Sequence, residues 1–203
     1  METPAAPARI SDQIEGWLHQ KGEKTLGSLV VLFERKSFAV IFLFLLGVPA
    51  LPLPTGGATH VLEVIAMLLS LQLIAGRQEV WLPERWLRIE LGGAKQQKFV
   101  NGLLKVIRWF ERWTRPRLRG AFDHRVSSSV FGLLMLLLSI AAFVAPPFSG
   151  LDTLPSLGGV VVALAVLVED FALVILGLAI GVIGVALEIV IGRAALSGIE
   201  KLF

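Results

Sequence analysis

Two proline- and glycine-rich stretches, each set between apolar runs, constrain this 203-residue chain more than any other feature. The first is PALPLPTGGATH at 49–60, and the second is PPFSGLDTLP at 146–155. Because proline lacks a backbone N–H donor and fixes φ, neither stretch can continue a helix. The chain must therefore form separate helices on the two sides of each break. The breaking prolines are Pro49, Pro52, Pro54, Pro146, Pro147 and Pro155.

Composition and segment length predict that the apolar runs lie in lipid. Hydrophobic residues make up 55% of the chain and charged residues 17%, against ~45–50% and ~25% in soluble domains. A helix needs ~20 residues to cross a hydrocarbon core of ~30 Å. By that measure 171–192 is a comfortable span, 128–145 is marginal, and 37–48, 61–75 and 157–168 are short. We therefore predict an all-α integral membrane protein with one C-terminal transmembrane helix.

The short runs beside the breaks leave two interpretations of each break. It is either an ordinary turn at the membrane surface or the tip of a re-entrant hairpin that stops partway across. Unpaired backbone in bare lipid costs several kcal/mol per group, so a buried tip must be covered by protein or face water. The shortness of the runs 37–48 and 61–75 favours a re-entrant hairpin at the first break.

The two breaks also resemble copies of one another. Shifting the sequence by 94 residues without a gap aligns them, and apolar helix follows both. Such a match around a broken helix is typical of internally duplicated membrane proteins; coincidence is the alternative, because proline, glycine and leucine are common here. We therefore predict two duplicated helical hairpins. The aligned pairs are Pro52 with Pro146, Thr55 with Ser149, Gly56 with Gly150 and Thr59 with Thr153.

A single membrane domain is predicted, divided into consecutive parts. Residues 1–9 form a loose tail, and 10–76 hold an amphipathic helix followed by the first hairpin. A basic, tryptophan-rich linker occupies 77–127, and 128–203 hold the second hairpin and the last helix. The start of the chain lacks the basic and then apolar pattern of a cleavable signal peptide.

The linker is predicted to lie at the membrane surface. Residues 77–126 hold twelve basic and five acidic residues, a net charge of +7, and four of the five tryptophans. Tryptophan prefers the membrane–water interface, and a basic amphipathic helix binds anionic headgroups. The bilayer is therefore a better partner for this charge than nucleic acid. The predicted interfacial residues are Trp81, Trp86, Trp109, Trp113, Arg108 and Arg112.

The same charge predicts orientation, because basic loops remain in the cytoplasm. With the linker inside, both hairpins enter and leave from the cytoplasmic side, and the run 171–192 carries the C-terminus outside. A different number of crossings would turn the duplication into an inverted repeat.

Motifs of catalysis or metal binding are not found in the sequence. Cysteine and tyrosine are absent, and the three histidines, His19, His60 and His124, do not share metal-ligand spacing. Nucleophile elbows, P-loops and dinucleotide-binding glycine motifs are also missing. We expect neither an enzyme nor a metal or cofactor site.

Polar groups in or beside the apolar runs are the better candidates, since burying them is costly. His60 and Glu63 lie one helical turn apart, and form either a proton- or ion-handling pair or a solvated loop end. Asp152 is expected to cap the following helix, and Gln72 to hydrogen-bond across helices. Gly177 and Gly181 either permit close helix packing or are merely tolerated. The candidate polar site is His60, Glu63, Gln72, Asp152, Glu169 and Asp170.

The acidic residues of the last run have simpler interpretations. Glu169 and Asp170 precede its helix, where the helix dipole favours negative charge. Glu188 is also a polar candidate within an apolar run; the alternative is a simple interfacial position, since it lies about a turn before Arg193.

The segments around the first break resemble the exopolysaccharide synthesis ExoD family. The resemblance rests on LGVPALPLPTGG followed by LSLQLIAGRQEVWLPERWL, and it covers the chain from about Ile10 to the last helix. The second half is similar through a looser Pro-x-Phe break, a Leu-Pro and an acidic pair, with Phe171 where the family has glycine. The matching residues are Gln72, Gly76, Arg77, Trp81, Leu82, Pro83, Pro147, Phe148, Leu154, Pro155, Glu169 and Asp170.

This resemblance implies a bacterial inner-membrane protein that is needed for exopolysaccharide production and has no known catalytic activity. Three hypotheses follow. The protein is a small transporter or accessory subunit for synthesis or export, a scaffold that recruits polysaccharide-synthesis proteins through the linker, or an enzyme or scramblase acting on lipid-linked sugars. One chain offers few helices to cover two breaks, which also favours a homodimer.

Overall fold

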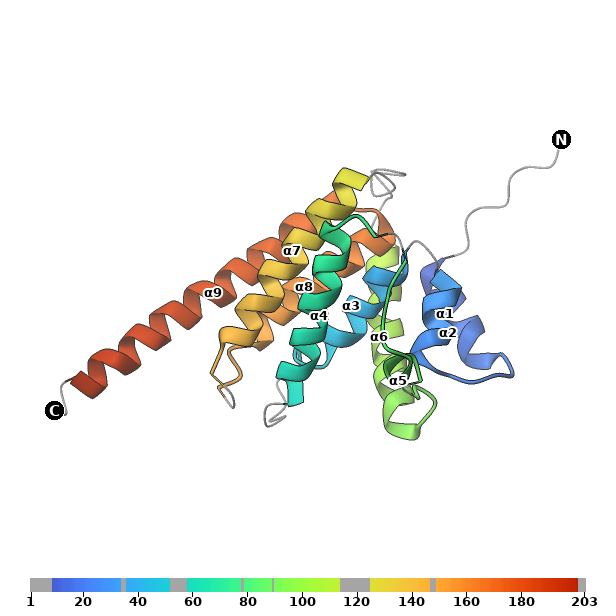
Figure 1. Ribbon diagram of the computed structural model, residues 1–203, viewed down its shortest axis with the longest axis horizontal. Helices are drawn as coiled ribbons and strands as arrows, with labels where there is room; N and C mark the ends of the chain where they lie inside the picture. The colour runs from blue at the N-terminus through green and yellow to red at the C-terminus, as the bar shows by residue number, and fades with distance from the viewer. Residues whose placement is uncertain are drawn as a thin grey trace.

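The computed structural model describes residues 9–33, 36–51, 58–77, 79–88, 90–113, 125–146 and 149–200. Over these residues the chain is helical, apart from turns and an isolated antiparallel bridge between Thr25 and Glu90, which confirms the all-α prediction. Pro52, Pro54, Pro147 and the other residues of 52–57 and 147–148 lie outside the described part. The helices in chain order are α1 (Ile10–His19), α2 (Leu26–Phe33), α3 (Ser37–Gly47), α4 (Ala58–Ile74), α5 (Glu84–Leu87), α6 (Ala94–Trp113), α7 (Arg125–Val144), α8 (Thr153–Val168) and α9 (Phe171–Glu200) (Figure 1).

Helices α3 and α8 form the centre of the molecule, and α4, α7 and α9 pack around them. Every residue of α3 is buried, and so is nearly all of α8 from Pro155 to Leu167. The outer helices instead expose large apolar side chains, such as Leu68 on α4, Leu137 on α7 and Ile183 on α9. An exposed apolar surface that spreads over three helices is what a lipid-facing bundle requires.

Two of these helices are long and apolar enough to cross a membrane, at Val126–Val144 and Phe171–Ala194. They correspond to the runs that the sequence predicted as a marginal and a comfortable span. The shorter apolar helices are α3, α4 and α8.

The two hairpins turn at the same end of the bundle. Helix α4 runs antiparallel to α7: the Ser129 hydroxyl donates to the Ile74 carbonyl at 3.4 Å, and the His60 and Phe143 rings lie 5.3 Å apart at the other end. Helix α8 runs back along α7 and α3, so that its start lies with His60. We call this end, with His60, Val144 and Asp152, the tip end. The opposite end, with Lys36, Ile74, Val126 and Glu169, is the linker end.

Helix α3 stops about halfway along α7. The Phe42 ring meets the edge of Phe131 on α7, with centroids 5.6 Å apart. One turn further, Leu46 and Met135 both lie against Gly159 of α8. Met135 is at the middle of the apolar segment Val126–Val144, so α3 ends near mid-depth of that segment. The chain then turns at 48–50, where Pro49 prevents continuation of the regular helix.

Helices α8 and α9 approach each other through glycine. A side chain at Gly158 would begin 2.7 Å from the Gly177 carbonyl oxygen and 2.9 Å from the Gly181 nitrogen. Such distances leave no room for a Cβ atom, so the small residues permit backbone contact. Of the two interpretations of Gly177 and Gly181, close packing is therefore the one that the structure supports.

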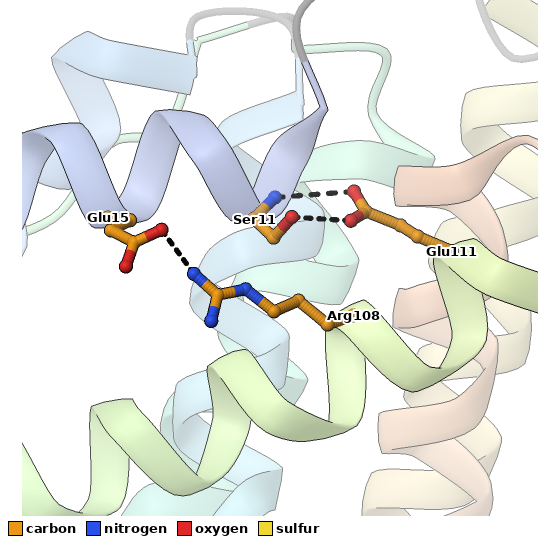
Figure 2. Close-up of polar contacts among 4 residues, drawn as sticks. All are labelled: Ser11, Glu15, Arg108 and Glu111. Atoms are coloured by element: carbon orange, nitrogen blue, oxygen red, sulfur yellow. Dashed lines mark hydrogen bonds and ion pairs between the residues drawn. The ribbon is translucent and has the colours of Figure 1, made fainter.

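Helices α1, α2, α5 and α6 lie together at one side of the bundle (Figure 1). The α6 face with Val100, Leu104 and Ile107 is buried, which confirms its amphipathic character. Figure 2 shows the contact of α6 with α1: Glu111 accepts hydrogen bonds from the Ser11 N–H at 3.2 Å and from the Ser11 hydroxyl at 2.5 Å.

Arg108 of α6 forms an ion pair with Glu15 of α1, one turn beyond Ser11 (Figure 2). The sequence predicted Arg108 at the lipid interface and did not predict that it pairs with a residue of the same chain. Trp81, Trp109 and Arg112 are exposed, and Trp86 is half-buried. Trp113 ends α6, but its side chain lies outside the described part.

Candidate functional site

The tip end gathers titratable side chains from three separate helices. His60 and Glu63 occupy successive turns of α4, and the His60 Nδ1 atom lies 2.8 Å from Oε2 of Glu63. Residues three apart on a helix share a face, which is why the sequence alone could pair them. The pair is not a solvated loop end, because the Glu63 side chain is 0% exposed and that of His60 is 24% exposed.

The second carboxylate oxygen of Glu63 is unsatisfied. Oε1 is buried and has no hydrogen-bond partner among the residues that the structure describes. Burying a polar atom without a hydrogen bond costs ~1–3 kcal/mol by protein mutational data, and a charge costs more. A structural role does not explain such an atom, because a leucine would fill the same space without the cost.

Asp152 and Glu188 extend this pair into a cluster. The charge of Asp152 acts on Glu63, and the charges of Asp152 and Glu63 both act on Glu188. Asp152 stands at the N-cap position of α8 but forms no capping hydrogen bond with its side chain, so the predicted capping role is wrong. Its half-buried carboxylate is thus available to the cluster.

Glu188 is one of the polar groups that the sequence offers as candidates, with a simple interfacial position as the alternative, and it is not part of the predicted polar site. Its Oε1 atom is buried and lacks a hydrogen-bond partner within the described residues. The available signal was its isolation, since it is the only acidic residue in Phe171–Ala194. An acid inside a spanning helix is expected to face the protein interior.

The cluster lies in the half of the bundle that α3 does not reach. His60 is level with Phe143, near the end of α7, whereas α3 ends level with Met135. Glu63, one turn from His60, therefore lies beyond the C-terminus of α3. A helix C-terminus carries partial negative charge. Carboxylates and helix end together make this region electronegative, and His60 is the basic group acting on Glu63 among the described residues.

Glu169 and Asp170 lie at the linker end, a full helix length from the cluster. Lys36 donates to Oε1 of Glu169 at 2.9 Å and to the Leu167 carbonyl at 3.0 Å. Asp170 accepts the Ala172 N–H at 2.9 Å and so caps α9. Both acids are therefore satisfied within the protein, and the structure separates them from His60, Glu63 and Asp152.

Gln72 also belongs to the linker end. Its amide donates to the Trp81 carbonyl and accepts the Trp81 N–H, both at 2.9 Å. The prediction that Gln72 bonds to another helix is wrong. Its side chain bonds instead to the backbone of Trp81, in the segment that follows its own helix. Helix α4 ends just beyond it, with Gly76 at φ 79° and the Arg77 N–H bonded to the Gln72 carbonyl at 3.0 Å. These bonds form a glycine-terminated Schellman cap.

This geometry gives a physical role to residues that carry the resemblance noted above. Gln72, Gly76, Arg77 and Trp81 together end α4 and anchor the linker to it. Helix α8 ends in a related way, with Glu169 at φ 58° and the Asp170 N–H bonded to the Ala165 carbonyl at 3.0 Å. Across the described ranges, His, Asp and Glu side chains do not form a group of three or more that could hold a metal ion.

Comparison with known proteins agrees with this pattern. Residues 10–190 match the family described as "Exopolysaccharide synthesis, ExoD". An uncharacterised protein of Synechocystis sp., slr1875, is 26% identical over 153 residues, which cover 74% of this chain and 71% of that protein. No solved structure matches. Since the family match covers nearly the whole chain, the protein belongs to the ExoD family of exopolysaccharide synthesis proteins.

Proposed function

We propose that this protein is a multi-pass protein of the bacterial inner membrane that supports exopolysaccharide synthesis or export as a small, non-enzymatic transporter. Family membership connects it to exopolysaccharide synthesis. The two span-length helices and the exposed apolar faces of α4, α7 and α9 are consistent with a membrane protein.

One observation carries the transport role: the fully buried Glu63, with Oε1 unpaired among the described residues, lies beyond the end of α3. Transporters commonly place polar sites where a membrane helix is interrupted, because half-helix ends and freed backbone groups bind ions there. Helix α3 supplies such an interruption in this fold, and Glu63 lies beyond its end together with the acids that interact electrostatically with it.

The duplicated, re-entrant arrangement is part of this proposal. Its support is the crosswise packing, in which α3 lies against α8 and α4 against α7, with both breaks at one end. The similar endings of α4 and α8 support it further. Because both breaks share an end, the two hairpins would form a parallel repeat about the membrane normal, with the basic linker in the cytoplasm.

The test is exopolysaccharide secretion by a strain that lacks its own copy of this protein and carries a variant. We expect Glu63→Gln to reduce secretion at least tenfold, while Glu84→Gln, an exposed glutamate on α5, leaves it unchanged. Membrane extracts must contain equal amounts of both variants. Full secretion by Glu63→Gln would refute the transport role.

Topology is tested separately with single cysteines, since the natural chain has none. Leu51→Cys and Ser149→Cys at the tips should react with a small water-borne thiol reagent from the periplasmic side, and Lys98→Cys in the linker from the cytoplasm. Labelling of the tips and the linker from the same side would contradict the proposed arrangement.

A scaffold for polysaccharide enzymes is the second candidate, favoured by the exposed basic side chains of α6. Lys98, Lys105 and Arg112 point away from the core, whereas Arg108 is occupied by Glu15. If the scaffold role is correct, Lys105→Gln combined with Arg112→Gln abolishes secretion, and Glu63→Gln does not. The transporter role predicts the reverse.

A further inference from the structure

We propose that the cluster of Glu63, Asp152 and Glu188 is a proton-binding site, with Glu63 as the group that takes the proton and His60 as its connection to water. This inference rests on the proposed transport function, which it deepens by naming the proton as the coupled ion. The proton adds to a carboxylate oxygen of Glu63 and later returns to water, so that only an O–H bond forms and breaks.

The first argument is the contrast between the two oxygens of Glu63. Oε2 has a partner in His60 Nδ1 at 2.8 Å, while Oε1 is buried with none among the described residues. A bound proton would neutralise this carboxylate, which removes most of the cost of keeping it away from water. The buried, unpaired oxygen is the feature that distinguishes this cluster from a solvated group of acids.

The second argument is the charge that surrounds Glu63. Helices α3 from Ser37 to Gly47 and α7 from Val126 to Val144 contribute no ionisable side chain. The residue before α8 contributes Asp152, and α9 contributes Glu188, with Arg193 further along. The Asp152 carboxylate disfavours a negative charge on Glu63, and Glu63 and Glu188 disfavour a negative charge on one another. The protonation of Glu63 therefore depends on charges contributed by α9 and by the residue before α8.

His60 is suited to connect the buried oxygen with water. Its side chain is 24% exposed, and its ring rests on Phe143 of α7 with centroids 5.3 Å apart. The histidine thus bridges the surface of the tip end and the buried carboxylate. A metal ion is a poorer occupant, because the acidic and histidine side chains among the described residues do not converge as metal ligands do.

Infrared spectroscopy of the purified full-length protein in lipid nanodiscs tests this inference without any polysaccharide. The carboxylic acid C=O band is recorded as a function of pH, and the Glu63 contribution is the difference between wild type and Glu63→Gln. We expect a band that grows as the pH falls and is missing in Glu63→Gln but kept in Glu84→Gln. Its loss only in Glu63→Gln assigns the proton to that residue.

The coupling within the cluster gives the decisive measurement. Asp152→Asn and Glu188→Gln each remove a neighbouring negative charge, so the midpoint of the Glu63 band should move to lower pH by on the order of one unit. Glu84→Gln should leave the midpoint in place. Asp152→Asn changes only a half-buried helix end, so it also serves as the test if Glu63→Gln does not fold.

Two results would overturn the inference: no pH-dependent band that Glu63→Gln removes, or a Glu63 band that neither Asp152→Asn nor Glu188→Gln displaces. Either result leaves the secretion experiment valid, because a transporter for another ion would still need Glu63. If Glu63→Gln abolishes secretion but the Glu63 band is missing or is not displaced, the proton inference fails and the transport function stands.

Discussion

The acidic side chains at the two ends of the helix bundle differ in how fully they are hydrogen-bonded. At the linker end, Glu169 has Lys36 as a partner and Asp170 caps α9. At the tip end, Glu63 and Glu188 each keep an oxygen without a hydrogen bond among the described residues, and Asp152 stands at a helix start without capping it. The linker end is therefore arranged for stability. The tip end retains polar groups that cost stability, which is typical of a functional site.

The largest effect is expected when the buried acid of the tip end is removed. Glu63→Leu replaces a carboxylate that has a buried, unpaired oxygen with an apolar side chain of similar size, and the partly exposed His60 can then bond to water. The change should therefore stabilise the fold by about 2 kcal/mol. It should abolish secretion at the same time. Unfolding in mixed SDS micelles, followed by circular dichroism, measures the change, and the exposed Glu84→Leu is the control. A destabilised Glu63→Leu protein would show that this acid is structural after all.

The next effect compares two aspartates at helix starts. Asp170→Ala should destabilise the protein by about 1 kcal/mol, because the capping bond to the Ala172 N–H is lost. Asp152→Ala should cost at most a few tenths of a kcal/mol, since its side chain makes no such bond. The same SDS titration compares the variants. Equal losses for the two would remove the distinction between the ends.

A smaller loss is expected for Lys36→Met at the linker end. The change removes the bonds to Glu169 and to the Leu167 carbonyl but keeps an apolar stem of similar length. Because both side chains of the ion pair are partly exposed, we expect a loss of about 0.5–1 kcal/mol. Lys105→Met, on the exposed face of α6, is the matched control. High salt should reduce the difference between Lys36→Met and wild type, in thermal unfolding followed by tryptophan fluorescence.

The smallest effect is expected for Glu169→Gly. Glycine adopts the left-handed φ of 58° without the steric cost that glutamate bears, which favours the variant by about 1 kcal/mol. Loss of the Lys36 ion pair offsets much of this gain. The variant should therefore unfold within about 0.5 kcal/mol of wild type. In a protein that already carries Lys36→Met there is no ion pair left to lose, so Glu169→Gly should then stabilise the fold. A double-mutant cycle of the two changes measures this difference.

The local part of this protein could be predicted from its sequence. The existence of the two breaks, the apolar runs and the amphipathic face of α6 follow from proline chemistry and helical periodicity. The predicted bounds of the breaks, 49–60 and 146–155, are too wide, because α4 already begins at Ala58 and α8 at Thr153, and Pro155 fits the first turn of α8. Periodicity likewise places His60 and Glu63 on one face of a helix. The family followed from motif residues whose role is also local, since Gln72, Gly76 and Arg77 terminate a single helix.

Contacts between helices were decided only by the tertiary structure. Helical spacing determines which residues share a face, but the level and rotation of one helix against another depend on how whole surfaces pack. The Gly158–Gly177 contact brings α9 against α8 and places Glu188 at the tip end, and the packing of Leu46 and Met135 on Gly159 places the end of α3 at mid-depth. For the same reason the ion pair of Arg108 with Glu15 could not be predicted from the sequence. Nor could the effect of the Asp152 charge on Glu63, or the lack of a capping bond from Asp152 to α8.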